Sequence, residues 1–267
     1  MKVTLEPDAG GGGPVRVLAR GLTVLRVFTP ANRWLSNHEI AAAALLPRPT
    51  VSRITAPLTS LGYLDYSSRT GRYRLGNSVL TLGFHALANL DIHLIARPYM
   101  QQLADEVDAL VVLSSRDGLA MVCNEVCHGN NILTLRVSVG SRLSLPNSAM
   151  GRALIGTMEP ARRANLLDLI RNAVGEEWSR IEAAFPDAES QMLKKGFYTS
   201  IGTLELGVNG VGTILETRNA PHTYALGVAG PAFRFPMESL ESDIGPRLLA
   251  TRDRIQRRLQ EAQGQDS

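Results

Sequence analysis

The sequence predicts an α+β protein built from two parts, a small basic segment near the N-terminus and a larger mixed segment after it. Two observations support this fold class. Arginines are concentrated in residues 15–77, and strand-like and helix-like runs after residue 95 follow one another without strict strand-helix-strand alternation. The length of 267 residues suits two modest domains or one large domain.

The basic segment has an unusual charge balance. Residues 15–77 contain nine arginines against two acidic residues, a net charge of +7 in a chain whose total is +3, which leaves −4 for the rest. Clustered arginine in one small domain is typical of a phosphate-binding surface. Charge alone does not separate such a surface from one that is merely basic, so the local pattern has to decide.

Apolar residues at helical spacing predict a first helix near residues 17–28, through Leu18, Leu22, Leu25 and Phe28. A second, short helix is expected to begin at Ser36. There Ser36 and Glu39 have the spacing of a capping box, in which each side chain satisfies an amide of the first turn. We expect this second helix to end near residue 46.

A third helix is predicted after the tight turn at residues 46–48, with Pro49 in the first helical position, where a missing N–H costs nothing. Its apolar face comprises Val51, Ile54, Leu58 and Leu61. A short helix, a tight turn and a helix with a polar amino end form a helix-turn-helix, whose second helix meets base edges in the major groove. The residues expected to contact DNA are Arg48, Pro49, Thr50, Ser52 and Arg53, with Arg20 added from the first helix.

One residue of this third helix departs from the pattern. Pro57 lies in its interior, where a proline costs about 3 kcal/mol, so we expect a kink or an early end there. Two short alternating runs follow, at residues 63–66 and 72–75, and the turn between them predicts a β-hairpin wing. Arg69 and Arg72 are expected at its tip, near phosphates or a minor groove, although a solvated surface arginine would look the same.

The larger segment shows strand-like and helix-like runs. Strands are predicted at 109–113, 119–126, 132–137, 208–215 and 223–228, and helices at 160–171, 178–195 and 248–259. Cys123 and Cys127 are four apart, which would place both on one face of a strand; buried thiols are favoured over a metal site, because four ligands are not evident. We expect no metal and no cofactor. Residues 1–14 are expected to be a disordered tail, and without a signal or membrane-spanning run the protein is expected in the cytoplasm.

Many short stretches of the chain match one family in order. They are residues 19–25, 46–53, 61–64, 70–76, 139–143, 149–154, 196–198 and 230–231. On these stretches the sequence resembles the IclR family of bacterial regulators. The resemblance implies a winged helix-turn-helix at residues 15–77, a linker helix at 78–94 and a GAF/profilin-like effector-binding domain at 95–263. It also implies homodimers, often dimers of dimers, operator DNA as partner, and control by a small metabolite, commonly a carboxylate or an aromatic compound.

An effector pocket is expected where the loop at residues 140–146 leads into a helix capped by Asn147 or Ser148. The amides of such a first turn, here up to Gly151, can hold a carboxylate, although an ordinary capped helix would look the same. The resemblance adds further pocket residues, namely Leu135, Leu143, Ala149, Met150, Ser200, Val208, Gly210, Gly227 and Ala229.

Four of these positions differ from what is common in the family. The family often has an acidic residue at position 200, cysteine at 210 and serine at 227 and 229, where this chain has Ser200, Gly210, Gly227 and Ala229. Smaller and less polar side chains leave more room and fewer hydrogen bonds. We therefore expect an effector larger and more apolar than a two- or three-carbon acid, for example an aromatic acid.

The function favoured by these patterns is a sequence-specific DNA-binding transcription regulator under the control of a small molecule. One alternative is an architectural DNA binder without an effector. An enzyme with an accessory DNA-binding domain is disfavoured, because the chain has no HExxH, GxSxG or phosphate-loop motif and its histidines are scattered. One catalytic arrangement stays open, a cysteine nucleophile at Cys123 or Cys127 beside His128. No motif supports it, and we predict no catalytic residue.

Overall fold

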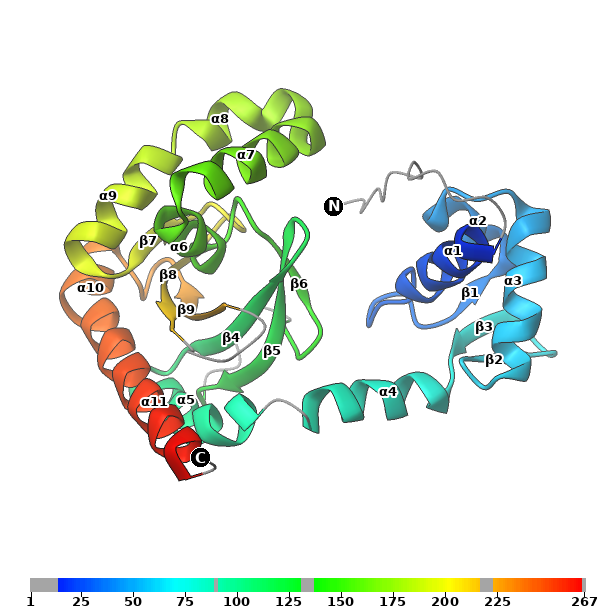
Figure 1. Cartoon of the computed structure of the whole chain (residues 1–267), viewed down its shortest axis with the longest axis horizontal. Coiled ribbons are helices and arrows are strands. Elements are labelled where there is room, and N and C mark those ends of the chain that lie inside the picture. The colour runs from blue at the N-terminus through cyan, green and yellow to red at the C-terminus, as the bar shows by residue number, and fades with distance from the viewer. Residues whose placement is uncertain (1–13, 89–90, 131–136, 217–222, 266–267) are drawn as a thin grey trace. The chain divides into compact units, whose positions relative to one another are not determined.

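A computed structural model describes residues 14–88, 91–130, 137–216 and 223–265 (Figure 1). The chain divides into two compact units, residues 1–89 and 90–267, and each is described by itself. Almost all of the expected N-terminal tail lies outside the described residues. The predicted α+β class is confirmed, since helices and antiparallel strands are mixed in both units.

The first unit is a small helical domain with a three-stranded antiparallel sheet. Its elements are α1 (Pro14–Arg26), β1 (Leu35–Ser36), α2 (Asn37–Ala44), α3 (Arg48–Ser60), β2 (Leu64–Ser67), β3 (Arg72–Leu75) and α4 (Asn77–Ala88). The sheet order is β1-β3-β2, and β2 and β3 form the predicted hairpin. Buried side chains from all three helices before the hairpin form its core, including Val24, Ile40 and Val51.

The capping box is present as predicted. The Ser36 hydroxyl accepts the Glu39 N–H at 3.3 Å, and the Ser36 N–H donates to the Glu39 carboxylate at 2.7 Å. At the other end, Leu45 adopts the left-handed conformation with φ 55°, so α2 ends at Ala44, slightly before the predicted position. The short helix and tight turn of the helix-turn-helix are therefore both fixed by local backbone bonds.

Two details of the predicted helices are wrong, the position of Pro49 and the burial of Leu61. Helix α3 begins at Arg48, so Pro49 occupies its second position. The helix continues past Pro57 to Ser60, so the early end, one of the two outcomes expected at Pro57, does not occur. Pro57 lies on the exposed face, where water can solvate the carbonyl that the proline leaves without a donor. Leu61 is 64% exposed rather than buried, because α3 has already ended.

Helix α1 also differs from its predicted packing. Leu18 and Leu22 are more than half exposed, and the buried residues of this stretch are Val24 and Phe28. The apolar stripe of α1 therefore extends well beyond the surface that the first unit covers.

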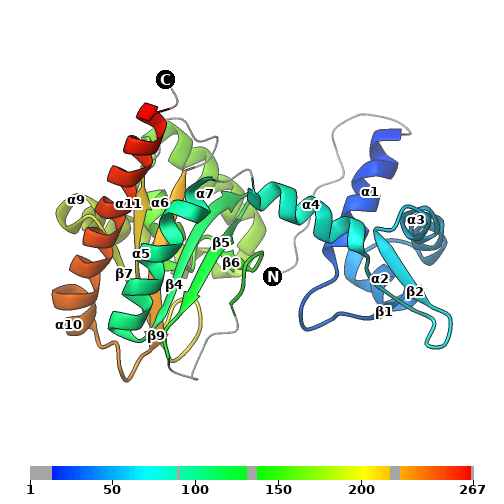
Figure 2. The same ribbon diagram turned by 90° about the horizontal axis from the view of Figure 1, so that it is seen from below.

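The second unit is a six-stranded antiparallel sheet with helices on both faces. Its elements are α5 (Asp91–Val107), β4 (Leu110–Asp117), β5 (Ala120–His128), β6 (Arg142–Ser144), α6 (Ala149–Thr157), α7 (Pro160–Val174), η1 (Gly175–Glu177), α8 (Trp178–Glu182), α9 (Phe185–Lys195), β7 (Tyr198–Ile201), β8 (Val208–Leu215), β9 (Tyr224–Pro231), α10 (Met237–Ser239), η2 (Leu240–Ile244) and α11 (Gly245–Gln265). The strand order is β6-β5-β4-β9-β8-β7. Helices α5 and α11 cover one face, and α6 to α9 lie on the other, as Figure 1 and Figure 2 show.

The sequence missed some of these elements and misplaced one boundary. The short strands β6 and β7 were not predicted, and the strand expected at 132–137 lies almost entirely outside the described residues. Residues 91–94, expected in a linker helix at 78–94, belong to α5, and Ile92 is buried in the core of the second unit. Helix α4 alone occupies the described part of the chain between the hairpin and residue 88.

The two cysteines lie on opposite faces of the sheet, so the expectation of a shared face is wrong. A β-bulge lies between them: Leu113 pairs with Glu125 and Ser114 pairs with Cys123, which leaves Asn124 without a partner on β4. The extra residue reverses the alternation of side chains. Cys127 therefore packs in the core under α5, whereas Cys123 packs in the core under α6.

Burial makes both thiols unreactive. It raises the pKa of Cys123 to about 12 and that of Cys127 to about 11, where the nearby Glu125 carboxylate adds to the effect. Because the thiolate is the nucleophile, we expect no reaction with a disulfide reagent at pH 8 in the folded protein and two thiols per chain after unfolding in guanidinium. Prompt labelling of the folded protein would contradict this arrangement.

Glycines bring α6 directly onto the sheet. A Cβ at Gly212 of β8 would lie 2.6 Å from the Met150 nitrogen and the Ala149 carbonyl carbon. A Cβ at Gly151 would overlap the Leu145 carbonyl, so the loop before α6 also packs against the helix without an intervening side chain. These two contacts fix the position of the amino end of α6 above β8.

We expect Gly212→Ala to lower stability by about 1–3 kcal/mol, because the methyl group would collide with backbone that has no rotamer to change. Gly83→Ala is the matched control, since Gly83 lies in α4 with nothing within 4 Å of its Cβ position. That change should be neutral or stabilising. Thermal and urea unfolding of the two variants measure the difference, and equal stability would refute the close approach.

Candidate DNA-binding surface and effector pocket

The amino end of α3 presents a polar, exposed face. The Arg48 guanidinium donates to Nδ1 of His38 on α2, with Nε at 3.1 Å and a terminal nitrogen at 2.6 Å. The Ser52 hydroxyl donates to the Arg48 carbonyl at 3.2 Å and accepts from the Asn37 side chain at 3.0 Å. Arg48 and Ser52, two of the predicted DNA-contacting residues, are therefore held by contacts to α2 or to their own helix turn.

The remaining predicted residues of this surface differ in their surroundings. Arg53 and Pro49 are exposed, whereas Thr50 and Arg20 are half-buried. Within the described part of the chain, Arg53 makes no ion pair and no side-chain hydrogen bond. Its guanidinium is thus the one most available to a new partner at the amino end of α3.

The wing holds its two predicted arginines differently. Arg69 lies exposed in the turn between β2 and β3, as expected. Arg72 begins β3, and its guanidinium donates to the Trp34 carbonyl at 2.9 Å and to the Glu39 carboxylate at 3.2 Å. This ion pair fastens the wing to the start of α2, and it occupies part of the guanidinium that was expected to meet phosphates.

Glu39 therefore has a second role besides capping α2, which is to hold Arg72. The backbone N–H and hydroxyl of Ser36, followed by Arg72, hold the pKa of the Glu39 carboxyl below its usual value. A carboxylate has two oxygens, and only one is needed for the capping box. Sequence reasoning missed this ion pair, because the two residues are 33 positions apart and no local spacing connects them.

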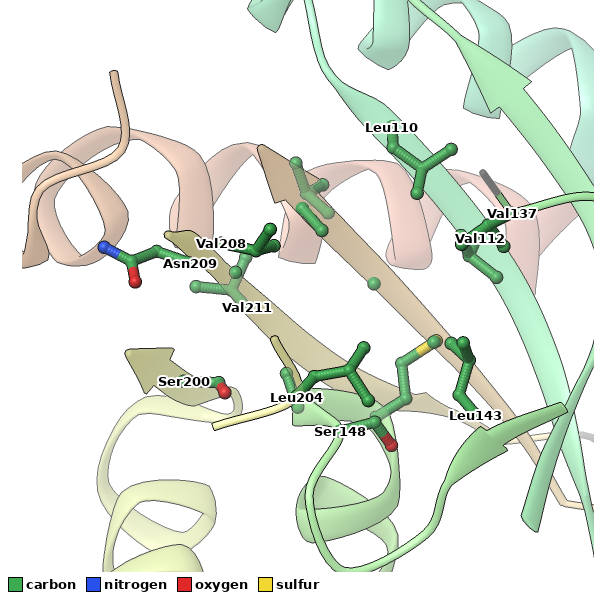
Figure 3. Close-up of a pocket in the computed structure, with 16 residues that line it drawn as sticks. Leu110, Val112, Val137, Leu143, Ser148, Ser200, Leu204, Val208, Asn209 and Val211 are labelled. Atoms are coloured by element: carbon green, nitrogen blue, oxygen red, sulfur yellow. The ribbon is translucent and has the colours of Figure 1, made fainter. Parts of the chain in front are cut away.

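A cavity lies beside the amino end of α6, over the sheet (Figure 3). The room in it for the centre of a water-sized molecule is about 40 Å³, and the wider empty space, which includes open solvent at its mouth, is about 470 Å³. Eight residues predicted for the effector pocket line it: Leu143, Ala149, Met150, Ser200, Val208, Gly210, Gly227 and Ala229. Sequence reasoning missed eight others: Leu110, Val112, Val137, Ser148, Leu204, Asn209, Val211 and Val228.

Two predicted pocket residues, Asn147 and Gly151, do not line this cavity. A third, Leu135, lies outside the described residues. The backbone carbonyl of Asn147 accepts the Thr203 hydroxyl at 2.7 Å, and Gly151 packs against the Leu145 carbonyl. Asn147 and Gly151 thus shape the loop and helix behind the cavity wall.

The polar groups at the cavity are few. Ser148 caps α6, and its hydroxyl accepts the Gly151 N–H at 3.1 Å, which leaves the amides of Ala149 and Met150 without an acceptor inside the helix. The Ser200 hydroxyl is hydrogen-bonded to the Thr203 hydroxyl. The Asn209 side chain donates to the Phe235 carbonyl at 2.9 Å and accepts the Gly202 N–H at 3.0 Å, and Figure 3 shows it turned away from the cavity.

The two pocket glycines do not leave the open room expected from the sequence. A Cβ at Gly210 would lie 2.5 Å from the Val228 carbonyl oxygen. A Cβ at Gly227 would lie 2.7 Å from Cγ and 3.0 Å from Sδ of Met150. The space above Gly227 is therefore already filled by the Met150 side chain.

A buried cation lies close to the cavity. Arg152 is 5% exposed, and it donates to the Pro146 carbonyl at 2.8 Å and to the Tyr198 hydroxyl at 2.7 Å, with its guanidinium 5.5 Å from the centre of the Tyr198 ring. Among the described residues, no carboxylate oxygen lies within 4.0 Å of it. Sequence reasoning missed Arg152, although a lone arginine in an otherwise apolar helix was visible at residues 149–157.

Two family models match the chain. The IclR helix-turn-helix domain matches residues 17–68, and the C-terminal domain of the bacterial transcriptional regulator IclR matches residues 84–257. The chain belongs to the IclR family of bacterial transcriptional regulators. It is therefore a DNA-binding regulator with a C-terminal effector-binding domain, and neither the architectural nor the enzymatic alternative is favoured.

Relatives and solved structures agree with this assignment. The chain is 29% identical over 250 residues to the HTH-type transcriptional regulator TsaQ1/TsaQ2 of Comamonas testosteroni, covering 93% of this chain and 90% of that protein. An IclR-family regulator from Brucella abortus has a similar structure, with a TM-score of 0.79, 40% identity and 90% of each chain covered. An IclR homologue from Microbacterium hydrocarbonoxydans, solved in complex with 4-hydroxybenzoate, has a TM-score of 0.73 at 20% identity, with 92% of this chain and 99% of that chain covered.

For the described residues of the chain, the sequence predicts neither membrane-spanning helices nor groups of metal-binding side chains. In that part of the chain, no helix is both long and apolar enough to cross a membrane. The same residues contain no group of three or more histidine, cysteine or acidic side chains that could hold a metal ion.

Proposed function

We propose that this IclR-family regulator acts as a homodimer whose α3 helices contact operator DNA, and that an organic acid bound in the cavity beside α6 controls it. The observation that carries the effector proposal is the cavity itself, which places two unpaired helix amides beside apolar walls. An acid that carries an apolar body matches both features.

For the DNA contact, we propose that Arg53 contacts a base and that Arg48, Pro49, Thr50 and Ser52 contact bases or phosphates. Arg20 and Arg69 are proposed as phosphate contacts from α1 and the wing. Arginine pairs with guanine through two hydrogen bonds in the major groove, which suits the unpaired guanidinium of Arg53. We assign Arg72 the task of positioning the wing, because Glu39 already holds it.

For assembly, we propose that the exposed apolar faces of α1 and α4 form the dimer surface. On α1, Val15, Leu18 and Leu22 are 54–68% exposed, and on α4, Leu80 and Phe84 are 73% and 67% exposed. Such faces are costly in water, and a second copy of the chain would cover them. A dimer of dimers remains a further expectation from the family.

For the effector, the local charge favours an anion. Among the described residues, no acidic side chain lines the cavity, and Arg152 carries a buried positive charge without a carboxylate partner nearby. We propose an aromatic acid, since the walls are mainly aliphatic side chains and since a relative of the same fold was solved with 4-hydroxybenzoate. Regulators of this kind act on DNA in the cytoplasm, and we infer no catalytic activity, so candidate acids should be recovered unchanged.

The DNA contacts are tested with duplexes selected from a random pool by the full-length protein. Arg53→Ala should relax the preference for one base pair and cost about 1–3 kcal/mol on the best site. Arg69→Ala should instead weaken all duplexes similarly and reduce the salt dependence of binding by about one phosphate contact. If neither variant changes affinity, α3 and the wing do not face DNA as proposed.

The anion preference is tested by calorimetry with 4-hydroxybenzoate and its neutral analogue 4-hydroxybenzamide. A buried charge near the acid group should contribute on the order of 1 kcal/mol, so Arg152→Gln should weaken acid binding about five- to tenfold. The amide should change by less than about twofold, and Arg152→Lys, which keeps the charge, should bind the acid more tightly than Arg152→Gln. Equal loss for acid and amide would show that Arg152 acts only through the fold.

A further inference from the structure

We propose that Met150 sets the upper size of the effector, because the acid can enter fully only by displacing the Met150 side chain from the floor of the cavity. This inference rests on the effector site proposed above and names the residue that determines its specificity. Met150 belongs to the first turn of α6, two residues after the cap Ser148, so its backbone amide and its side chain border the same space.

The Met150 side chain occupies the space that a ligand would need. It is 5% exposed, and its Cγ and Sδ lie 2.7 Å and 3.0 Å from the position that a Cβ of Gly227 would take. A glycine in β9 is therefore what allows the thioether to lie on the sheet. With Met150 in this position, the space near the helix amides suits a small acid group, and a larger ligand body would overlap the side chain.

The hydrogen bond that Met150 accepts can be replaced by another when its side chain moves. The hydroxyl of Ser114, which is fully buried in β4, donates to Sδ of Met150 at 3.1 Å. A thioether is a weak acceptor, and the same hydroxyl also lies 3.5 Å from the Ala225 carbonyl oxygen. When Met150 moves, the Ser114 hydroxyl can turn to this carbonyl, so displacement leaves no buried donor without an acceptor.

The valines and glycines of the cavity wall lack this freedom. Val112, Val208 and Val211 are β-branched residues on strands, with side chains restricted at the first torsion. Gly210 and Gly227 have no side chain to move. Methionine has three rotatable side-chain bonds and adapts readily to irregular space. Among the flexible side chains of the wall, which also include Leu110, Leu143 and Leu204, Met150 is the one that packs over Gly227.

The test compares a one-ring acid, 4-hydroxybenzoate, with a two-ring acid, 6-hydroxy-2-naphthoate, by calorimetry on the full-length protein. The ratio of the two dissociation constants reports size selection. In the wild type we expect the two-ring acid to bind at least tenfold more weakly. Met150→Ala removes three heavy atoms and should shift the ratio at least tenfold toward the two-ring acid. Met150→Leu, which keeps the volume, should shift it less than about threefold.

Gly227→Ala provides a second arm, in which a substitution adds atoms beside Met150 instead of removing them. The added methyl group should push Met150 into the ligand space and weaken 4-hydroxybenzoate binding at least fivefold. In the Met150→Ala background the same change should weaken it less than twofold. An unchanged size ratio in folded Met150→Ala, or an equal effect of Gly227→Ala in both backgrounds, would overturn the assignment of Met150. If neither acid binds any of these folded proteins, the proposed acid effector itself is refuted, and the inference falls with it.

Discussion

The close approach of α6 to the sheet is the constraint on which the effector pocket depends. Backbone meets backbone at Gly212 and Gly151, and a single methyl group at either position would collide with main-chain atoms. The contact holds the first-turn amides of α6 over β8, at a depth that side chains in between would not allow. Ser148 caps the Gly151 N–H, and the two residues whose amides have no acceptor inside the helix, Ala149 and Met150, line the cavity.

This geometry is the physical basis for proposing an anion as the ligand of a mainly aliphatic cavity. A buried amide without an acceptor costs about 1–3 kcal/mol, and a helix amino end stabilises negative charge by about 0.3–1 kcal/mol, or up to ~2 kcal/mol when partly buried. Arg152 adds a full positive charge, which its two neutral acceptors at Pro146 and Tyr198 do not compensate. One carboxylate on a ligand would give the amides an acceptor and would balance the charge of Arg152. Few neutral ligands could do both.

Much of this fold followed from local patterns, and the exceptions have local or tertiary causes. The capping box, the wing and strand β8 were predictable from spacing because they depend on residues close in sequence. The reversal of Cys123 was not, because one unpaired residue, Asn124, defeats the two-residue period of a strand. The glycines at 210 and 227 suggested empty room, but the neighbours that occupy it come from β9 and α6, far away in sequence. A resemblance names the positions of a pocket, and only packing shows which of them are open.

The β-bulge at Asn124 lies close to side chains that make contacts on both faces of the sheet in the effector-binding domain. On one side, Ser114 at the register shift contacts Met150; on the other, Glu125 accepts Nδ1 of His93 at 3.2 Å and the Arg97 guanidinium at 2.5 Å, both on α5. The register shift between Leu113 and Ser114 therefore lies between the Met150 contact on one face and the contacts of Glu125 with α5 on the other. An effector shifts an equilibrium only by its difference in affinity for two arrangements. A side chain that must move for binding, as we infer for Met150, is a physical source of such a difference. Its partner Ser114 lies at the register shift between β4 and β5.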